Sequence, residues 1–426
     1  MSAITSAVLA TEASSGWAIA VTAGALLAFA LVSRRLHGSP VSPAMVFVAL
    51  GLLLGTEGLD IVGSNLDAAA VRLLAEVTLA LVLFTDAASI HIRALARESS
   101  VPLRLLLIGL PLTIAAGALA GLALFPTLGV FEVLILAIVL APTDAALGEP
   151  VVADERLPSF LRQGLNVESG LNDGICVPLL FAAITMAQLD RAPEFDGEVV
   201  VDLVKEVVVA ASVGVAASAL GAVLLKYSVR RGWIEGRWVQ SVPLATVAIA
   251  YTVTAELGGS GFVAAFAAGL AYRLIAGHDL TTESVPLLHE LGGVLSAVTF
   301  FVFAGAVVGP AVFDLGVTTV VYAVLSLTMV RMVPVGVALL GTELPAPTVA
   351  FAGWFGPRGL ASIVFALIIV DDAGLPGTPL VVQVTAVTVL ISVFAHGATA
   401  PWLVSRFVGW SEGRASRSAP MTEPGG

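Results

Sequence analysis

Apolar runs follow one another along almost the whole chain, and short polar connections separate them. An α-helix rises about 1.5 Å per residue, so about 20 apolar residues cross the hydrocarbon core of a bilayer. By this measure thirteen membrane-spanning helices are expected, at residues 16–33, 42–56, 69–89, 101–124, 131–149, 160–186, 202–227, 239–256, 260–275, 286–308, 315–340, 347–370 and 379–404. Gly and Pro stand at most of the joins, as turns require. The pattern predicts an all-α polytopic membrane protein with a membrane domain over residues 1–410.

The composition supports a membrane protein. Of the 426 residues 58% are hydrophobic and 12% are charged, whereas about 25% are charged in soluble domains. The net charge of −11 gives no support for nucleic-acid binding. Cys176 is the single cysteine, which excludes a disulfide within the chain. Residues 1–15 lack the basic segment of a cleavable signal peptide, and the apolar run after them is long enough to be a span.

The basic residues indicate how the chain is oriented. If the N-terminus lies outside, most of the 20 Lys and Arg residues fall in connections on the inner side, among them Arg34, Arg35, Arg230 and Arg231. Cytoplasmic connections carry such an excess of Lys and Arg. We therefore expect a multi-pass protein of the cell membrane with its N-terminus outside and its C-terminus in the cytoplasm. Residues 411–426 are rich in Ser, Gly, Glu, Arg and Pro, and a disordered tail is expected there.

The sixth expected span carries polar side chains at the depth of the bilayer centre. Glu168 and Asn172 are four residues apart and share one helix face, and Ser169 and Asp173 share the adjoining face. Polar groups can join helices through hydrogen bonds alone. Two carboxylates within six residues favour a functional site, because an unpaired charge at this depth costs several kcal/mol.

Two further spans contain residues that interrupt a helix. The sequence Ala141-Pro142-Thr143-Asp144 lies in the fifth span and Gly356-Pro357-Arg358-Gly359 in the twelfth. Interrupted helices at corresponding places in two halves of a transporter indicate its binding site near the bilayer midplane, although a proline kink is the alternative for either one alone. The offset of seven spans predicts an inverted repeat. Asp144 is expected to face positive half-helix ends and Arg358 negative ones.

Arg331, Arg358 and Asp86 also lie in apolar surroundings. Arg331 and Arg358 both need acidic partners at this depth, and Glu168 is the expected partner of Arg331. Asp86 stands near the end of the third span, either in the site or as an interfacial residue near the inner surface.

Four motifs in this order and spacing resemble the monovalent cation/proton antiporter family, in its NhaP-type and sodium/proton exchanger branch. They are Ala141-Pro142-Thr143-Asp144, Glu168-Ser169-Gly170-Leu171-Asn172-Asp173-Gly174, Arg331 and Gly356-Pro357-Arg358-Gly359. The resemblance implies an NhaA/NhaP-like fold with two crossed, interrupted helices and six helices on each side of the seventh span. It also implies a homodimer, in which a core domain of residues 101–186 and 315–404 moves against an interface domain of residues 16–89 and 202–308.

The resemblance also implies a role for each matching residue. Asp173 matches the carboxylate that binds a cation or a proton in turn, and Asn172 matches the neutral residue that accompanies electroneutral exchange. The other implied members of the cation and proton site are Asp144, Ser169, Thr143 through its carbonyl, and Asp86 on the inner path of the ion. Structural roles are implied for Glu168, Arg331 and Arg358. Gly170 and Pro357 depart from the family pattern.

The chemistry of these residues suits cation/proton antiport. A monovalent cation such as Na⁺ prefers several oxygen ligands. Burial of a carboxylate favours the protonated form and a bound cation favours the charged form, so one acid can carry either. We find no ATP-binding motif, and no cofactor or catalytic residue is expected.

Three alternatives remain open from the sequence. The transported cation could be K⁺ or Li⁺ rather than Na⁺. A cation channel could use the same acids, but it would not need paired interruptions. An intramembrane serine protease could use Ser260 in Gly258-Gly259-Ser260-Gly261 with His278, His289 or His396 as its base.

Overall fold

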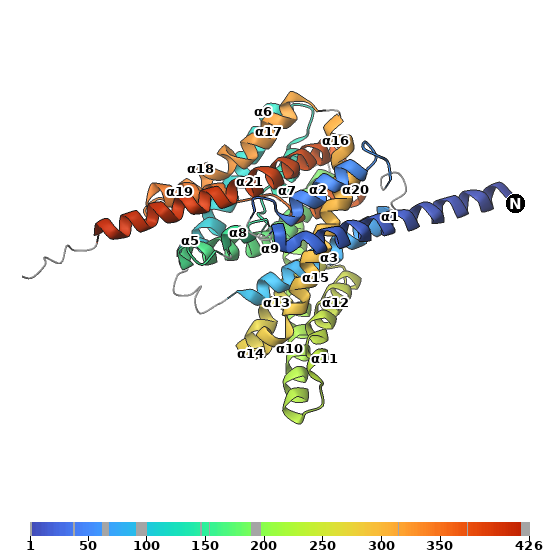
Figure 1. Cartoon of the computed structure of the whole chain (residues 1–426), viewed down its shortest axis with the longest axis horizontal. Coiled ribbons are helices and arrows are strands. Elements are labelled where there is room, and N and C mark those ends of the chain that lie inside the picture. Colours follow the sequence, from blue (N-terminus) through green and yellow to red (C-terminus); the bar gives the residue numbers. More distant parts are fainter. Residues whose placement is uncertain are drawn as a thin grey trace, which may run out of the picture.

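The computed structural model describes residues 2–36, 39–61, 68–90, 100–144, 147–152, 154–188, 197–313, 315–372 and 374–418. This described part is built of helices and turns, without a strand (Figure 1). The helices of the first half are α1 (Ser2–Leu36), α2 (Pro43–Leu54), α3 (Ala68–Ser89), α5 (Ser100–Arg104), α6 (Leu110–Leu124), α7 (Val130–Val139), α8 (Glu149–Val152), α9 (Ser159–Gln188) and α10 (Gly197–Arg231). Those of the second half are α11 (Gly236–Val239), α12 (Ser241–Glu256), α13 (Gly261–Ala276), α14 (His278–Ser284), α15 (Pro286–Phe303), α16 (Gly309–Phe313), α17 (Val317–Leu327), α18 (Met329–Ala338), α19 (Ala346–Trp354), α20 (Leu360–Asp372) and α21 (Thr378–Ser418).

Each of the thirteen predicted spans coincides with one of these helices or with a consecutive pair. By length and composition, eight described helical segments can cross a membrane. Shorter apolar helices at Pro43–Leu54, Val130–Val139, Gly261–Ala276 and Leu360–Val370 account for four more spans, and α3 for the last. The predicted all-α polytopic fold is therefore confirmed.

Local chemistry explains where individual helices begin. Ser42 precedes α2, and its hydroxyl accepts a hydrogen bond from the backbone N–H of Met45. Ser260 caps α13 in the same way, through the N–H of Val263. A serine at this position satisfies one of the free N–H groups of the first turn. The hydroxyl of Ser260, proposed above as a protease nucleophile, thus serves as a helix cap.

The structure differs from the sequence prediction in three places. The span at 315–340 is divided at Thr328, which has φ −112° and ψ −93° between α17 and α18. Two spans contain a π-helical turn, at Leu105–Gly109 and Ala304–Val308. Residues 411–418, where a disordered tail is expected, continue α21 as helix, because Glu, Arg and Ala there favour propagation of a helix already formed. Residues 419–426 lie outside the described part.

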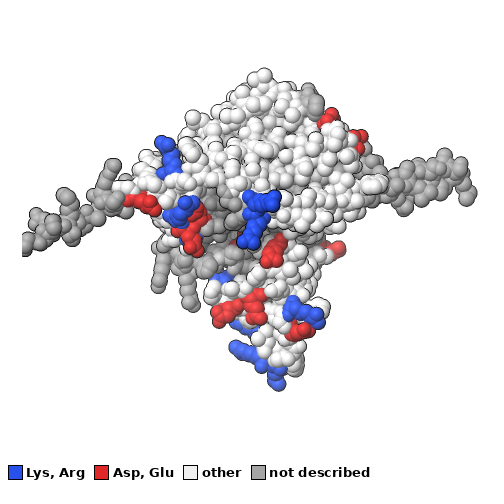
Figure 2. Space-filling view, in the orientation of Figure 1, with Lys and Arg blue, Asp and Glu red and all other residues white. Residues whose placement is uncertain are grey.

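Charge on the surface is confined to parts of the molecule. Lys, Arg, Asp and Glu gather over the region of α10, α11 and α14, and smaller groups lie at the left, the centre and the upper right, whereas the surface over α6 and α17 is free of charge in this view (Figure 2). Large apolar side chains on these helices face outward, and Leu119 of α6 and Val317 of α17 are 69% and 81% exposed. Such a surface is suited to contact with lipid rather than water.

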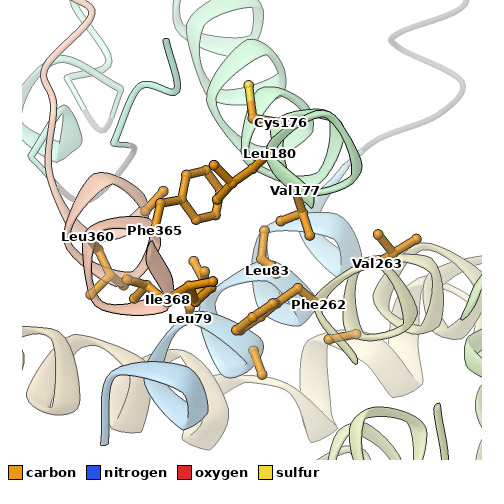
Figure 3. Close-up of a cluster of buried hydrophobic side chains, with 14 of the residues drawn as sticks. Leu79, Leu83, Cys176, Val177, Leu180, Phe262, Val263, Leu360, Phe365 and Ile368 are labelled. Atoms are coloured by element: carbon orange, nitrogen blue, oxygen red, sulfur yellow. The ribbon is translucent and has the colours of Figure 1, made fainter. Parts of the chain in front are cut away.

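The largest hydrophobic cluster holds helices of both predicted domains together. Leu79 and Leu83 of α3 and Phe262 of α13 meet Phe365 of α20 and Leu180 of α9 (Figure 3). Helices α3 and α13 belong to the predicted interface domain, and α9 and α20 to the predicted core domain. The contact between the two groups is therefore apolar where Figure 3 shows it.

Candidate ion-binding site

The two predicted interruptions lie against each other. Helix α7 ends at Val139 and α19 ends at Trp354, and α20 begins only at Leu360. Pro142 and Pro357 have no N–H and cannot continue the ladder of helical hydrogen bonds. The backbone N–H of Asp144 instead donates to the carbonyl of Pro357 at 2.8 Å. The irregular backbone that both breaks expose is thus paired in the interior of the protein.

Asp144 caps the second half of the broken helix. Its Oδ2 accepts from the N–H of Leu360, the first residue of α20, at 2.6 Å. Its Oδ1 accepts from the N–H of Leu147 at 3.0 Å. A carboxylate is stabilised at a helix N-terminus, where the helix dipole is positive. A side chain on Gly359 would overlap Oδ2 of Asp144, so this position requires glycine.

Arg358 lies at the opposite kind of helix end. Its Nη1 donates to the carbonyls of Ala141 and Pro142 at 2.9 and 3.0 Å, just beyond the end of α7. This negative helix end is the partner predicted for it. Among the described residues no ion pair joins Arg358 to an acid: its guanidinium is fully buried, Nη1 bonds to backbone oxygens, and Nε and Nη2 have no hydrogen-bond partner.

Glu168 of α9 and Arg331 of α18 form the predicted ion pair. Arg331 donates from Nη1 to Oε1 at 2.5 Å and from Nη2 to Oε2 at 2.8 Å. Both side chains are 2% exposed. A bidentate pair of this geometry offsets part of the cost of taking two charges into a low-dielectric interior. Gly356 stands directly against the Arg331 side chain, so the second interruption also leaves room for this pair.

The polar face of α9 binds the first interruption at one residue. Asn172 accepts from the N–H of Thr143 at 3.3 Å and donates from Nδ2 to the Thr143 hydroxyl at 2.8 Å. Ser169 donates its hydroxyl proton to the Thr143 carbonyl. All three polar groups of Thr143 are thereby held by α9. The predicted members Thr143, Ser169 and Asn172 are therefore brought together.

Asp173 follows this cluster by one residue on α9 and is 5% exposed. Its Oδ1 is buried and has no hydrogen-bond partner in the described structure. Asp144 and Asp86 are the acids whose charges act on it. A buried carboxylate oxygen without a donor is costly. A proton or a cation bound there would remove this cost.

Asp86 approaches α9 from α3. A side chain added at Gly170 would bring its Cβ to 3.3 Å from the Cβ of Asp86, which is tighter than ordinary contact. Asp86 is half-buried and lies three residues before the end of α3 at Ser89. The small residue at position 170, unusual for the family pattern, is what allows α3 and Asp86 to come this close.

Several residues that support the site could not be assigned from the sequence. Ser362 of α20 donates to the carbonyl of Val139 at 2.7 Å, and the hydroxyl of Ser392 accepts from the N–H of Arg358 at 2.7 Å. His396, one turn after Ser392 on α21, places Nε2 at 2.9 Å from the carbonyl of Trp354. The only sequence signal was a polar side chain within an apolar span. His396 therefore braces the end of α19, and its contacts give no support to a protease base.

The carboxylates do not form a compact metal cluster. Among the described residues, no group of three His, Cys, Asp or Glu side chains could hold a metal ion. A cation at Asp173 would need carbonyl and hydroxyl oxygens as further ligands. Such neutral oxygens suit a hard monovalent ion better than a transition metal.

Comparison with known proteins identifies relatives of the whole membrane region. Residues 21–406 match the family model described as "Sodium/hydrogen exchanger, transmembrane". The chain is 26% identical over 387 residues to the K(+)/H(+) antiporter NhaP of Alkalimonas amylolytica, covering 89% of this chain and 64% of that protein. It is 25% identical over 261 residues to the probable Na(+)/H(+) antiporter C3A11.09 of Schizosaccharomyces pombe, covering 58% and 34%. The chain thus spans less than two thirds of the length of these relatives.

A solved structure shows the same fold. The sodium proton antiporter MjNhaP1 from Methanocaldococcus jannaschii superposes with a TM-score of 0.75 over 92% of this chain and 99% of that one, at 18% identity. The NhaP-like fold expected from the motifs is confirmed.

The first prediction concerns the buried ion pair. Glu168→Gln or Arg331→Gln should lower the free energy of unfolding by about 3–5 kcal/mol, because each leaves one buried charge without its partner. The thermal midpoint of the purified protein in detergent measures this. Arg156→Gln is the control, since its 2.6 Å pair with Asp154 has an arginine that is 60% exposed, and such pairs contribute about 0–1 kcal/mol. If Glu168→Gln melts no earlier than the control, the pair does not brace the fold.

The second prediction concerns Gly359. Gly359→Ala should displace the Asp144 carboxylate from the start of α20 and cost about 1.5–3 kcal/mol, the contribution of a hydrogen bond to a charged group. Gly336→Ala in α18 is the control, because an added Cβ meets open space there. Thermal midpoints of the two variants should therefore separate, with Gly336→Ala at or above the wild type. Equal midpoints would contradict the close approach of Gly359 to Asp144.

Proposed function

This chain belongs to the sodium/hydrogen exchanger family, and we propose that it exchanges a monovalent cation for protons across the membrane by alternating access. The observation that carries the proposal is the buried, unpartnered oxygen of Asp173 beside two interrupted helices. Discontinuous helices near the midplane supply half-helix ends and free carbonyls to transported ions. No cofactor takes part in the proposed exchange.

Asp173 is the proposed carrier of both ions. Its neighbour on the same helix face is Ser169, one turn earlier, whose hydroxyl is bonded to the Thr143 carbonyl. These two oxygens, with the carboxylate of Asp173, form the proposed first ligands of the cation. Asp144 contributes charge from its place at the start of α20. Asp86, facing Gly170 from α3, is proposed to line the inner path of the ion.

The neighbouring charges support a one-for-one exchange. Glu168 is neutralised by Arg331, and Asp144 and Arg358 each lie at a helix end of opposite sign. Asn172 is uncharged. Asp173 is then the one site group proposed to gain and lose a charge during transport, so that one cation replaces one proton. We accordingly propose electroneutral exchange, with Asn172, Glu168, Arg331 and Arg358 as charge-balancing groups.

Na⁺ is the proposed cation, and K⁺ is the second candidate. The relatives described above include both a Na(+)/H(+) and a K(+)/H(+) antiporter. Exchange in proteoliposomes that contain a pH-sensitive dye, with Na⁺, K⁺ and Li⁺ supplied in turn, distinguishes the candidates. A channel would carry current without counter-transport of protons.

We further propose the arrangement that the resemblance implies. Residues 101–186 and 315–404, which contain both interruptions, form the moving core, and residues 16–89 and 202–308 form the interface of a homodimer. The placement of basic residues supports an outer N-terminus and a cytoplasmic C-terminus in the cell membrane.

The third prediction follows from competition at Asp173. Below the pH at which the site titrates, the apparent KM for the cation should rise about tenfold per pH unit, because protons occupy the carboxylate. The rate at saturating cation should change less. Initial rates against cation concentration at several symmetrical pH values measure both. A KM that does not depend on pH would mean that the proton travels on another residue, and Asp144 would be the next candidate.

The same assay tests the carboxylate directly. Asp173→Asn removes both the negative ligand and the proton carrier, so exchange should be abolished while the folded protein is retained in detergent. Asp279→Asn, in the exposed first turn of α14, is the matched control and should exchange like the wild type. Vigorous exchange by a folded Asp173→Asn protein would refute the role of Asp173.

The fourth prediction concerns charge balance. Asn172→Asp introduces a second titratable group beside the site and exchanges the Nδ2 donor to Thr143 for an acceptor. The rate of exchange should then respond to a membrane potential imposed with K⁺ and valinomycin, assayed with Na⁺ as substrate, whereas the wild-type rate should not. A wild-type rate that already follows the potential contradicts electroneutral exchange.

A further inference from the structure

A large apolar pocket lies between α18, α19 and α21, apart from the residues of the candidate ion site. Its volume is about 770 Å³, which is in the range of about 300–1,000 Å³ that holds organic ligands and far exceeds the needs of an ion. Aromatic side chains dominate its walls, and one charged residue lines it. The members used below are Phe351, Trp354, Trp402, Arg406, Phe407 and Trp410.

The sequence of α21 places this pocket at the edge of the apolar zone. From Thr378 onward, Arg406 is the first charged residue of the helix. Trp402 precedes it by one turn and is 61% exposed, so the pocket faces the surroundings of the helix bundle. Trp beside Arg at the end of an apolar segment is typical of the bilayer interface, where the ring lies at the depth of the lipid headgroups.

Arg406 is available to an external anion. Its guanidinium lies over the ring of Trp402, at 5.5 Å from the centroid. Within the described part of the chain, no ion pair of Arg406 with an acid is observed. A guanidinium that stacks on an aromatic face still presents its N–H groups at the edge, where they suit the oxygens of a phosphate.

We propose that this pocket binds an anionic phospholipid, with an acyl chain between the aromatic walls and the phosphate at Arg406. The apolar walls fit hydrocarbon, and the single cation at the mouth fits a headgroup of net negative charge. Basic pockets between transmembrane helices on the cytoplasmic side bind anionic headgroups on this principle.

The bound lipid would contact the end of α19. The indole Nε1 of Trp354 donates to the hydroxyl of Thr399 at 3.1 Å. The backbone carbonyl of Trp354 lies at 2.9 Å from Nε2 of His396. Trp354 is the last residue of α19 before the interruption at 355–359. The pocket and the broken helix therefore share this residue.

Quenching of tryptophan fluorescence by brominated lipids tests the proposal without a transport assay. Three of the six tryptophans line the pocket, Trp354, Trp402 and Trp410. The full chain with the three others changed, Trp17→Phe, Trp233→Phe and Trp238→Phe, reports on the pocket alone. It is reconstituted in nanodiscs that contain increasing fractions of dibrominated phosphatidylglycerol or dibrominated phosphatidylcholine.

Phosphatidylglycerol should reach half-maximal quenching at about one fifth of the mole fraction that phosphatidylcholine needs, as expected for one basic residue at an anionic headgroup. Arg406→Gln should remove this preference. Arg231→Gln is the matched control, because Arg231 stacks on Tyr227 at 5.3 Å but does not line the pocket. Ala350→Phe, which fills the pocket from α19, should lower quenching by both lipids while Arg406 is kept.

Three outcomes would overturn the proposal. Equal quenching by the two lipids would mean ordinary contact with bulk lipid. A preference for phosphatidylglycerol that survives Arg406→Gln would place the anionic headgroup elsewhere. Protection of the three tryptophans from both lipids would mean that a second copy of the chain or another protein covers the pocket.

Discussion

The reciprocal capping of two broken helices is the constraint on which the rest of the site depends. Asp144 closes the start of α20, and Arg358 closes the end of α7. An unsatisfied backbone group costs several kcal/mol in hydrocarbon. Each interruption therefore exposes groups that the other satisfies in part, and α9 and α21 bond further groups through Ser169, Asn172 and Ser392.

This arrangement explains why so many charged groups fit in one apolar interior. The charge of Glu168 is compensated by the side chain of Arg331, whereas the charges of Asp144 and Arg358 are stabilised by helix ends. The polar face of α9 uses Ser169 and Asn172 to hold Thr143 in place. Of the two carboxylates of α9, Asp173 is the one with a buried oxygen that has no hydrogen-bond partner among the described residues, whereas Glu168 is paired with Arg331.

The sequence was informative wherever a residue is incompatible with its surroundings. Proline and glycine within apolar runs revealed the two interruptions, and Arg331 at mid-span required the acid that Glu168 supplies. The interruption at Thr328 could not be foreseen, because threonine is tolerated inside helices. The need for glycine at position 359 also stayed hidden, since it arises from the path of Asp144 in another helix. Ser392 and His396 look like ordinary polar residues until α21 is placed beside the end of α19.

The contact among α3, α9, α13 and α20 has a mechanical consequence (Figure 3). Asp144 bonds to the start of α20, and Arg358 bonds to the carbonyls that follow α7. These hydrogen bonds tie the two interruptions into one unit. The labelled side chains of Figure 3 carry carbon and sulfur, and their contacts have no preferred direction. If the two groups of helices move against each other as proposed, that movement would break no hydrogen bond among these side chains, whereas the bonds between the two interruptions would be kept.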